Sequence, residues 1–150
     1  MAQFNKGAVQ LGPATPTQAE AAAPLIYNTD PKLFDYMYSD GHEAALKFLA
    51  IEWRRERSLM SFTHCTAAVR GDLLLGIELG YDRKTQETLN PETGVKGAVS
   101  LTDEALGWLL EAVGYLPYMM PPIIEWLKNY RSICCLNRNS GIENSYECWI

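Results

Sequence analysis

The chain has 150 residues, of which 47% are hydrophobic and 11% aromatic, with 13 basic and 18 acidic side chains. This composition is typical of a folded globular protein, and the length suits one domain spanning residues 1–150. The net charge of −5 argues against a nucleic-acid partner, because binding by counterion release requires a basic surface.

Nothing in the sequence indicates a membrane segment or a secretion signal. No apolar run approaches the ~20 residues of a spanning helix, and residues 1–6 lack the basic and apolar regions of a signal peptide. The four cysteines show neither metal-ligand spacing nor the pattern of a disulfide framework. We therefore expect a cytoplasmic protein with reduced cysteines, no bound metal and no membrane partner.

The first part of the chain predicts one short strand and three helices. The strand covers residues 9–11, and the sequence Thr15-Pro16-Thr17-Gln18 is a typical helix start with a capping threonine and an early proline. A similar signal before residue 31 predicts a second helix over 32–38. The third helix, predicted over 42–57, would carry Arg54, Arg55 and Arg57 in its last turn, where the helix dipole favours cations; a ligand-binding role is the alternative.

The middle of the chain predicts a β-hairpin. Residues 63–69 and 73–81 are rich in strand-forming side chains, and Arg70-Gly71-Asp72 between them is typical of a turn. Alternation in the second strand places Leu75, Ile77, Leu79 and Tyr81 on one face. Leu74, Gly76, Glu78 and Gly80 share the other face, where the glycines would leave an open groove around the Glu78 carboxylate.

A polar loop is expected over residues 82–97, followed by a fourth helix. Ser100 or Thr102 would cap this helix, which should end between Gly114 and Pro117. Its predicted inward side chains are Leu106, Leu109, Leu110 and Val113. The apolar segment 115–122 either packs under the helix or lines a hydrophobic channel, and a buried strand follows over 131–136.

A polar turn, Arg138-Asn139-Ser140-Gly141-Ile142-Glu143, follows that strand and leads into a helix. Consecutive backbone amides and the positive end of a helix meet at such a turn, which predicts binding of a phosphate or pyrophosphate. The segment resembles the acetyl-CoA motif of the GNAT acetyltransferase superfamily, a strand followed by Arg/Gln-x-x-Gly-x-Gly/Ala. Arg138 and Gly141 match this motif, whereas Glu143 stands where the family has a small residue.

The order of the predicted elements over residues 8–143 is similar to the first two thirds of a GNAT domain. Residues 22–27, 30–36 and 53–58 also resemble a bacterial subgroup with an elaborated helical region before its hairpin. The resemblance implies an α+β (α/β) fold, an incomplete GNAT-like domain with a mostly antiparallel central sheet flanked by helices. It also implies acetyl transfer from acetyl-CoA to a primary amine, carried by a small molecule or a peptide.

The same resemblance assigns the site residues by position. The backbone of Ser132, Ile133 and Cys134 would run beside the pantetheine arm of acetyl-CoA. The amides of Arg138, Asn139, Ser140, Gly141, Ile142 and Glu143 would face the pyrophosphate. Glu78 is the candidate carboxylate on the amine side; the alternative is an ordinary strand glutamate facing solvent.

Two departures from the family pattern predict little or no catalysis by this chain alone. The Glu143 carboxylate would repel a pyrophosphate by about 1 to 3 kcal/mol per phosphate charge. The family domain also continues with a further strand and helix, so the end at residue 150 suggests a truncated or frame-shifted product. The strand at 131–136 would then form an exposed sheet edge and allow a homodimer. The alternative function is a non-enzymatic α+β module that recruits a protein partner or a second copy.

Overall fold

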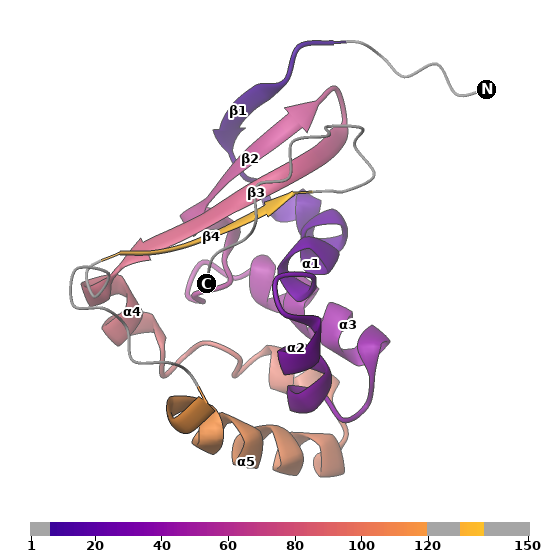
Figure 1. Cartoon of the computed structure of the whole chain (residues 1–150), viewed down its shortest axis with the longest axis vertical. Coiled ribbons are helices and arrows are strands. Elements are labelled where there is room, and N and C mark those ends of the chain that lie inside the picture. Colours follow the sequence, from indigo (N-terminus) through magenta and orange to yellow (C-terminus); the bar gives the residue numbers. More distant parts are fainter. Residues whose placement is uncertain (1–6, 120–129, 137–150) are drawn as a thin grey trace.

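The structure, a computed structural model, describes residues 7–119 and 130–136 (Figure 1). In chain order its elements are β1 (Gln10–Pro13), the 3-10 helix η1 (Pro16–Gln18), α1 (Ala19–Tyr27), α2 (Pro31–Met37), α3 (His42–Trp53), η2 (Phe62–His64), β2 (Cys65–Arg70), β3 (Leu73–Asp82), α4 (Arg83–Leu89), η3 (Gly97–Ser100), α5 (Asp103–Met119) and β4 (Tyr130–Leu136). Within these residues, no helix has both the length and the apolar content that a bilayer crossing requires.

The strands form one antiparallel sheet in the order β1-β2-β3-β4. The predicted hairpin is present as β2 and β3, joined by the two-residue turn Gly71-Asp72. Gly71 has a φ of 59°, as the first central residue of a type II′ turn requires, and this turn matches the twist of paired strands. The predicted strand over 131–136 is also present as β4 and pairs with β3. The α+β class with an antiparallel sheet is therefore confirmed.

A β-bulge in the hairpin corrects the predicted faces of β3. Ala68 pairs with Gly76 whereas Val69 pairs with Leu74, so Leu75 is the extra residue on β3. Because an extra residue reverses the alternation on one side of the bulge, Leu74 joins the core with Ile77 and Leu79. Leu75 is buried outside that core cluster, contrary to the expected pattern.

The core lies between the sheet and the paired helices α1 and α3 (Figure 1). Helix α1 contacts both β3 and α3 and is buried along the side that the sequence predicted, through Ala19, Ala22, Ala23 and Ile26. Trp53, fully buried at the end of α3, donates a hydrogen bond of 2.9 Å from Nε1 to the carbonyl oxygen of Thr15. This bond ties the end of α3 to the start of the α1 segment.

Both predicted helix starts near the N-terminus are confirmed. The Gln18 side chain accepts a 2.8 Å hydrogen bond from the backbone N–H of Thr15. The Asp30 carboxylate caps α2 by accepting a 3.0 Å bond from the N–H of Leu33. In each case a side chain close in sequence satisfies a backbone donor.

Helix α3 ends at Trp53, four residues before the predicted end at Arg57. The arginines therefore do not form a cationic last turn. Their guanidinium groups bond acidic side chains on three different segments: Arg54 to Glu20, Arg55 to Glu52, and Arg57 to Glu92. With each cation paired, the cluster is an ion-pair set that joins α3 to its neighbours.

The prediction of a loop over residues 82–97 is wrong for its first half. Asp82 accepts a 2.7 Å hydrogen bond from the N–H of Thr85 and so caps the helix α4. The second half is fixed to α3 by Glu52, whose carboxylate accepts bonds of 3.0 Å from Gly94 N–H and 2.8 Å from Gly97 N–H. A buried acid distant in sequence thus orders a segment whose own composition is typical of a loop.

Helix α5 begins where it was predicted, with the Thr102 hydroxyl accepting a 3.2 Å bond from Ala105 N–H. The predicted inward face is wrong in part, because Leu110 and Val113 are 67% and 44% exposed. The buried positions are Ala105, Leu109 and Ala112. The helix also continues to Met119, beyond its predicted end, and most of the interpretation of segment 115–122 lies outside the described side chains.

Candidate functional site

Glu78 lies near the middle of β3, with a strand on each side. Thr66 of β2 and Cys134 of β4 are its partners in the register of the sheet. Ile77 and Leu79, its neighbours along the strand, are buried in the core, whereas Glu78 and Thr66 are exposed. Because adjacent side chains alternate between faces, the Glu78 carboxylate stands on the face opposite the core.

The structure brings the predicted carboxylate and the predicted pantetheine-binding backbone together. Ser132 pairs with Gly80, Ile133 with Leu79, and Cys134 with Glu78 itself. Directly paired residues in an antiparallel sheet have Cα atoms roughly 4.5 to 5.5 Å apart. The sequence had indicated the two strands separately, and their register places Glu78 against the middle of β4.

The remaining predicted site residues lie outside the described part of the chain. They are Arg138, Asn139, Ser140, Gly141, Ile142 and Glu143. Anion binding by their amides stays a prediction from the sequence.

Thr66 is a residue of this region that the sequence analysis missed. Counting back from the two-residue turn with regular pairing places Cys65 opposite Glu78. The bulge at Leu75 shifts the register by one residue, so that Thr66 takes this place. A hydroxyl beside a carboxylate can donate a hydrogen bond or hold a water molecule, and the turn sequence alone does not reveal the bulge that places it there.

Cys65 and His64 do not form a nucleophilic pair. Cys65 is buried, its thiol donates to the carbonyl oxygen of Ser61 at 3.5 Å, and burial raises its pKa to about 12. The thiol therefore stays protonated at neutral pH, whereas nucleophilic cysteines depend on the thiolate. Burial also lowers the pKa of His64, whose Nε2 has no hydrogen-bond partner in the described structure.

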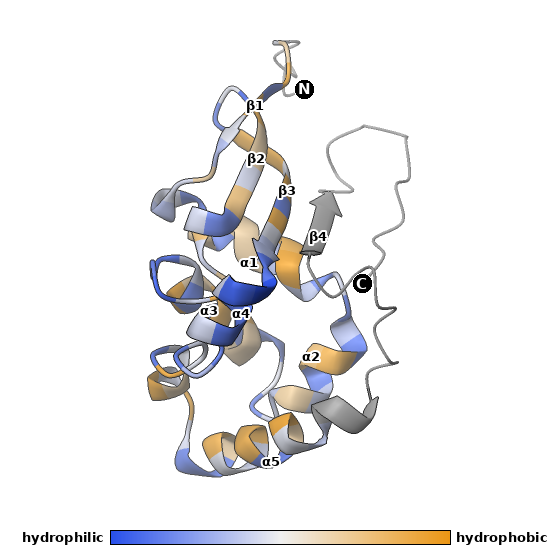
Figure 2. Cartoon of the chain, turned by 90° about the vertical axis from the view of Figure 1, so that its left-hand side faces the viewer, coloured by the Kyte–Doolittle hydropathy of each residue, from blue (hydrophilic) through white to orange (hydrophobic). Residues whose placement is uncertain are grey.

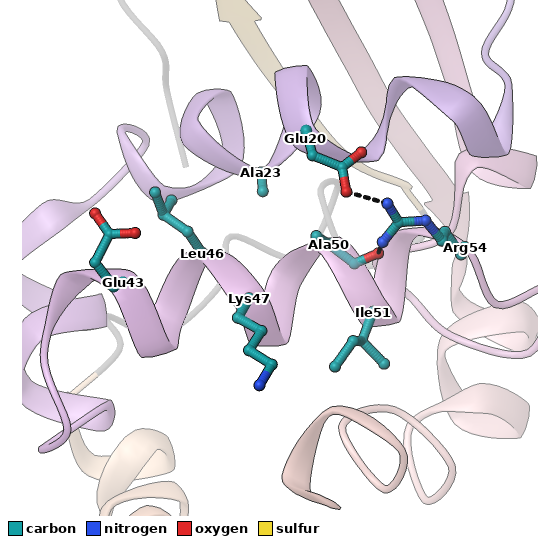
Figure 3. Close-up of a pocket in the computed structure, with 8 residues that line it drawn as sticks. All are labelled: Glu20, Ala23, Glu43, Leu46, Lys47, Ala50, Ile51 and Arg54. Carbon is teal, nitrogen blue, oxygen red and sulfur yellow. Dashed lines mark hydrogen bonds and ion pairs between the residues drawn. The ribbon is translucent and has the colours of Figure 1, made fainter. Parts of the chain in front are cut away.

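A surface depression of about 460 Å³ lies between α1 and α3 (Figure 3), and Glu78 is not among the residues that line it. Arg54 closes one end, because it bonds Glu20 and donates a 3.0 Å hydrogen bond to the carbonyl oxygen of Ala50. The other charged side chains of its lining are Glu43 and Lys47. Two acids and two bases give this depression no net charge with which to attract a polyanionic cofactor.

The described residues contain no group of three or more histidine, cysteine, aspartate or glutamate side chains that could hold a metal ion. The groups available for binding at this place are thus the Glu78 carboxylate, the Thr66 hydroxyl and the backbone of β4. These groups suit hydrogen bonding and proton transfer.

Comparison with known proteins gave one structural likeness. No protein-family model matches the chain, and no curated protein matches it in sequence. A crystal structure of an acetyltransferase is similar with a TM-score of 0.49 and 15% identity, over 70% of this chain and 49% of that protein. The chain thus spans about half the length of that acetyltransferase. A likeness at this level carries no functional inference.

Proposed function

We propose that this chain is a GNAT-type N-acetyltransferase domain, which binds acetyl-CoA and acts on a primary amine of a small molecule or a peptide. The observation that carries the proposal is the pairing of Glu78 with Cys134 in the register of β3 and β4. It places a carboxylate beside the strand whose sequence, together with the turn after it, resembles the acetyl-CoA motif.

The backbone of β4 supplies the proposed donor subsite. Among the described strands, β3 alone pairs with β4. The N–H and C=O groups on the other edge of β4 are therefore not hydrogen-bonded to any described strand. A pantetheine arm contains amides, which can bond to such an edge as an added strand does. Ser132, Ile133 and Cys134 provide these groups in the proposal.

Glu78 is the proposed proton acceptor. The amine nitrogen attacks the thioester carbonyl carbon, a C–N bond forms, the C–S bond breaks, and coenzyme A leaves as a thiolate. The nitrogen loses a proton to Glu78, directly or through water, and the thiolate is protonated to release the thiol. Thr66, opposite Glu78 on the exposed face, can hold a water molecule on this route.

Glu143 distinguishes this chain from the motif and explains why we propose weak activity. Its carboxylate would lie near the pyrophosphate, and a repulsion of about 1 to 3 kcal/mol corresponds to roughly five- to 150-fold weaker binding. Titration calorimetry with acetyl-CoA should show weak binding, strengthened by about tenfold or more in Glu143→Ala. Absence of binding in both proteins would overturn the assignment of the donor.

The role of Glu78 is tested by turnover. With a panel of primary amines, Glu78→Gln in the Glu143→Ala background should abolish acetyl transfer and leave acetyl-CoA binding unchanged. Glu87→Gln is the matched control, because Glu87 is an exposed acid on α4 and has no place in the register of β3 and β4. Equal turnover in the Glu78 and Glu87 variants would exclude Glu78 as the base.

The alternative proposal is a non-enzymatic module that associates through its sheet edge. It is favoured by the same feature of β4, which pairs with one described strand and leaves a second edge for another copy. A mass that rises with protein concentration and does not respond to coenzyme A would support it. A protein that stays monomeric and gives a binding isotherm in titration calorimetry with acetyl-CoA would support the acetyltransferase function.

A further inference from the structure

The outer face of the hairpin, opposite the core, carries side chains that the proposed reaction does not use. On β2 this face consists of Thr66, Ala68 and Arg70, which alternate with residues packed in or against the core. Glu78 of β3 lies opposite Thr66. The outer face of β2 thus begins beside the proposed proton acceptor and ends at Arg70.

Arg70 is a cation without a partner in the described structure. Its Nε is buried and has no hydrogen-bond partner, and none of the ion pairs among the described residues includes it. The residue as a whole is half-buried, so part of its side chain faces solvent. Buried polar atoms are nearly always hydrogen-bonded, and a guanidinium presents a fork of N–H donors that fits a carboxylate. Arg70 therefore indicates a place for an anion.

The surface between Glu78 and Arg70 is apolar. Leu11 of β1 lies opposite the half-buried Ala68 and is 75% exposed. Leu73, opposite Arg70, is 45% exposed. Orange apolar residues recur along the strands of the hairpin in Figure 2. An apolar chain can therefore lie over Ala68 and against Leu11, with a charged side chain at each end.

The spacing of the two charged side chains sets the length of that chain. Arg70 lies four residues along β2 from Thr66, the partner of Glu78, which corresponds to roughly 13 Å at the rise of a strand. An extended peptide of about four residues has the same span. A dipeptide is too short to reach both ends.

We propose that the acceptor is a short apolar peptide of about four residues, with its N-terminal amine at Glu78 and its C-terminal carboxylate at Arg70. The carboxylate of Glu78 repels the C-terminus and the guanidinium of Arg70 attracts it, which fixes the direction of the peptide. The amine receives the acetyl group, and the C-terminal carboxylate takes no part in the transfer. This inference rests on the acetyltransferase function proposed above and adds Arg70 as the residue that selects the acceptor.

The test compares acceptors in the Glu143→Ala background. They are an alternating leucine and alanine tetrapeptide with a free C-terminus, the same tetrapeptide as its carboxamide, the corresponding dipeptide in both forms, and propylamine. We expect the KM of the free tetrapeptide to be at least about tenfold below that of its carboxamide, because only the free acid can bind a guanidinium by charge-assisted hydrogen bonds. The free dipeptide should have no such advantage over its carboxamide.

Variants assign the preference to Arg70. Arg70→Gln should raise the KM of the free tetrapeptide to that of the carboxamide and leave kcat unchanged, as loss of an interaction made equally in the ground and transition states does. Its unfolding midpoint and its turnover of propylamine should match those of the parent protein. Arg83→Gln is the matched control, because Arg83 is an exposed arginine on α4. Leu11→Ser should raise the KM of both tetrapeptides and not that of propylamine.

The outcomes separate this inference from the proposed function. If propylamine is acetylated but the two tetrapeptides have equal KM, or if Arg70→Gln keeps the difference, the inference is wrong and the acetyltransferase function stands. If no amine is acetylated, the acetyltransferase function is wrong, and titration calorimetry with the free tetrapeptide decides on Arg70. Binding by the parent protein and not by Arg70→Gln would support recognition of the carboxylate, whereas equal binding or no binding would overturn it.

Discussion

The carboxylate of Glu52 accepts a 2.8 Å hydrogen bond from the backbone N–H of Gly97, forty-five residues further along the chain. It also accepts a 3.0 Å bond from Gly94 N–H and forms an ion pair with Arg55 at 2.9 Å. Glu52 is fully buried near the end of α3. One acid thus attaches the segment that leads to α5 onto the helical core.

Replacing Glu52 with glutamine should lower the free energy of unfolding by about 2 to 4 kcal/mol, because a buried charge pair is broken and a backbone donor loses its acceptor. Both carboxylate oxygens accept hydrogen bonds, whereas a glutamine amide can accept through one atom only. Urea unfolding followed by circular dichroism measures the loss. Glu20→Gln, which breaks the exposed pair with Arg54, is the control and should leave the free energy of unfolding nearly unchanged, because solvent screens an exposed ion pair.

The loss of unfolding free energy caused by Glu52→Gln should be smaller at acidic pH. Burial acts to raise the pKa of Glu52, but hydrogen bonds from Gly94, Ser58 and Gly97 and the charge of Arg55 outweigh it and hold the pKa below its usual value of 4.5. A carboxyl with a lowered folded pKa contributes stability above its unfolded pKa and loses it as the pH falls through the folded pKa. The difference between wild type and variant should therefore be full near neutral pH and decline below about pH 4.5. A difference independent of pH would show that the Glu52 charge is not responsible.

Local signals in the sequence predicted the helix starts and the hairpin because each depends on a few adjacent residues. Asp30 caps the helix that begins at the next residue, and Gly71 permits the turn between β2 and β3. The Leu75 bulge and the role of Glu52 could not be predicted in this way. Both depend on which distant backbone groups meet in the folded chain.

The candidate site was predictable in its parts and not in its assembly. An acid between two glycines pointed to Glu78, and the resemblance pointed to the strand that contains Cys134. Their pairing depends on the register between β3 and β4. No short turn joins these two strands, so their register cannot be counted from the sequence as it can in a hairpin. In α5, the apolar spacing predicted an inward face of Leu106, Leu109, Leu110 and Val113, whereas the buried positions are Ala105, Leu109 and Ala112. Which of two adjacent apolar faces is buried depends on how the helix packs against distant segments, and the sequence alone does not show this.

Gly97→Ala should destabilise the protein by about 1 to 3 kcal/mol, as overpacking in a filled site does. A methyl group there would come within 2.7 Å of Cδ2 of the Phe48 ring, and Phe48 is itself buried in the core. Gly107→Ala is the matched control in α5, where the added methyl meets nothing within 4 Å. Because alanine favours helix over glycine by up to about 1 kcal/mol, this control should be neutral or stabilising in thermal unfolding.

Cys65 should resist alkylation in the folded protein. Its thiol is buried and its pKa is raised to about 12 by burial, so the reactive thiolate is scarce at mildly alkaline pH. Iodoacetamide labelling followed by peptide mass spectrometry should detect the Cys65 adduct only after urea is added. Rapid labelling of Cys65 in the native protein would mean that the thiol is accessible and ionised.

His64 should make stability depend on pH in the weakly acidic range. Burial lowers its pKa from the usual 6.5, so the unfolded chain takes up a proton at a higher pH than the folded chain does. Stability contributed by the neutral ring is present above pH 6.5 and falls as the pH drops below it, by at most about 1.4 kcal/mol per pH unit for one group.

His64→Phe should reduce this decline. Phenylalanine keeps an aromatic ring beside Tyr81, whose centroid lies 6.1 Å from that of His64, and it removes the buried Nε2 that has no described partner. Near pH 7.5 the variant should therefore be at least as stable as the wild type, since an unsatisfied buried polar atom costs about 1 to 3 kcal/mol. Urea unfolding at several values between about pH 7.5 and 5.5 measures the slope for both proteins. An unchanged slope in His64→Phe would assign the pH dependence to another group.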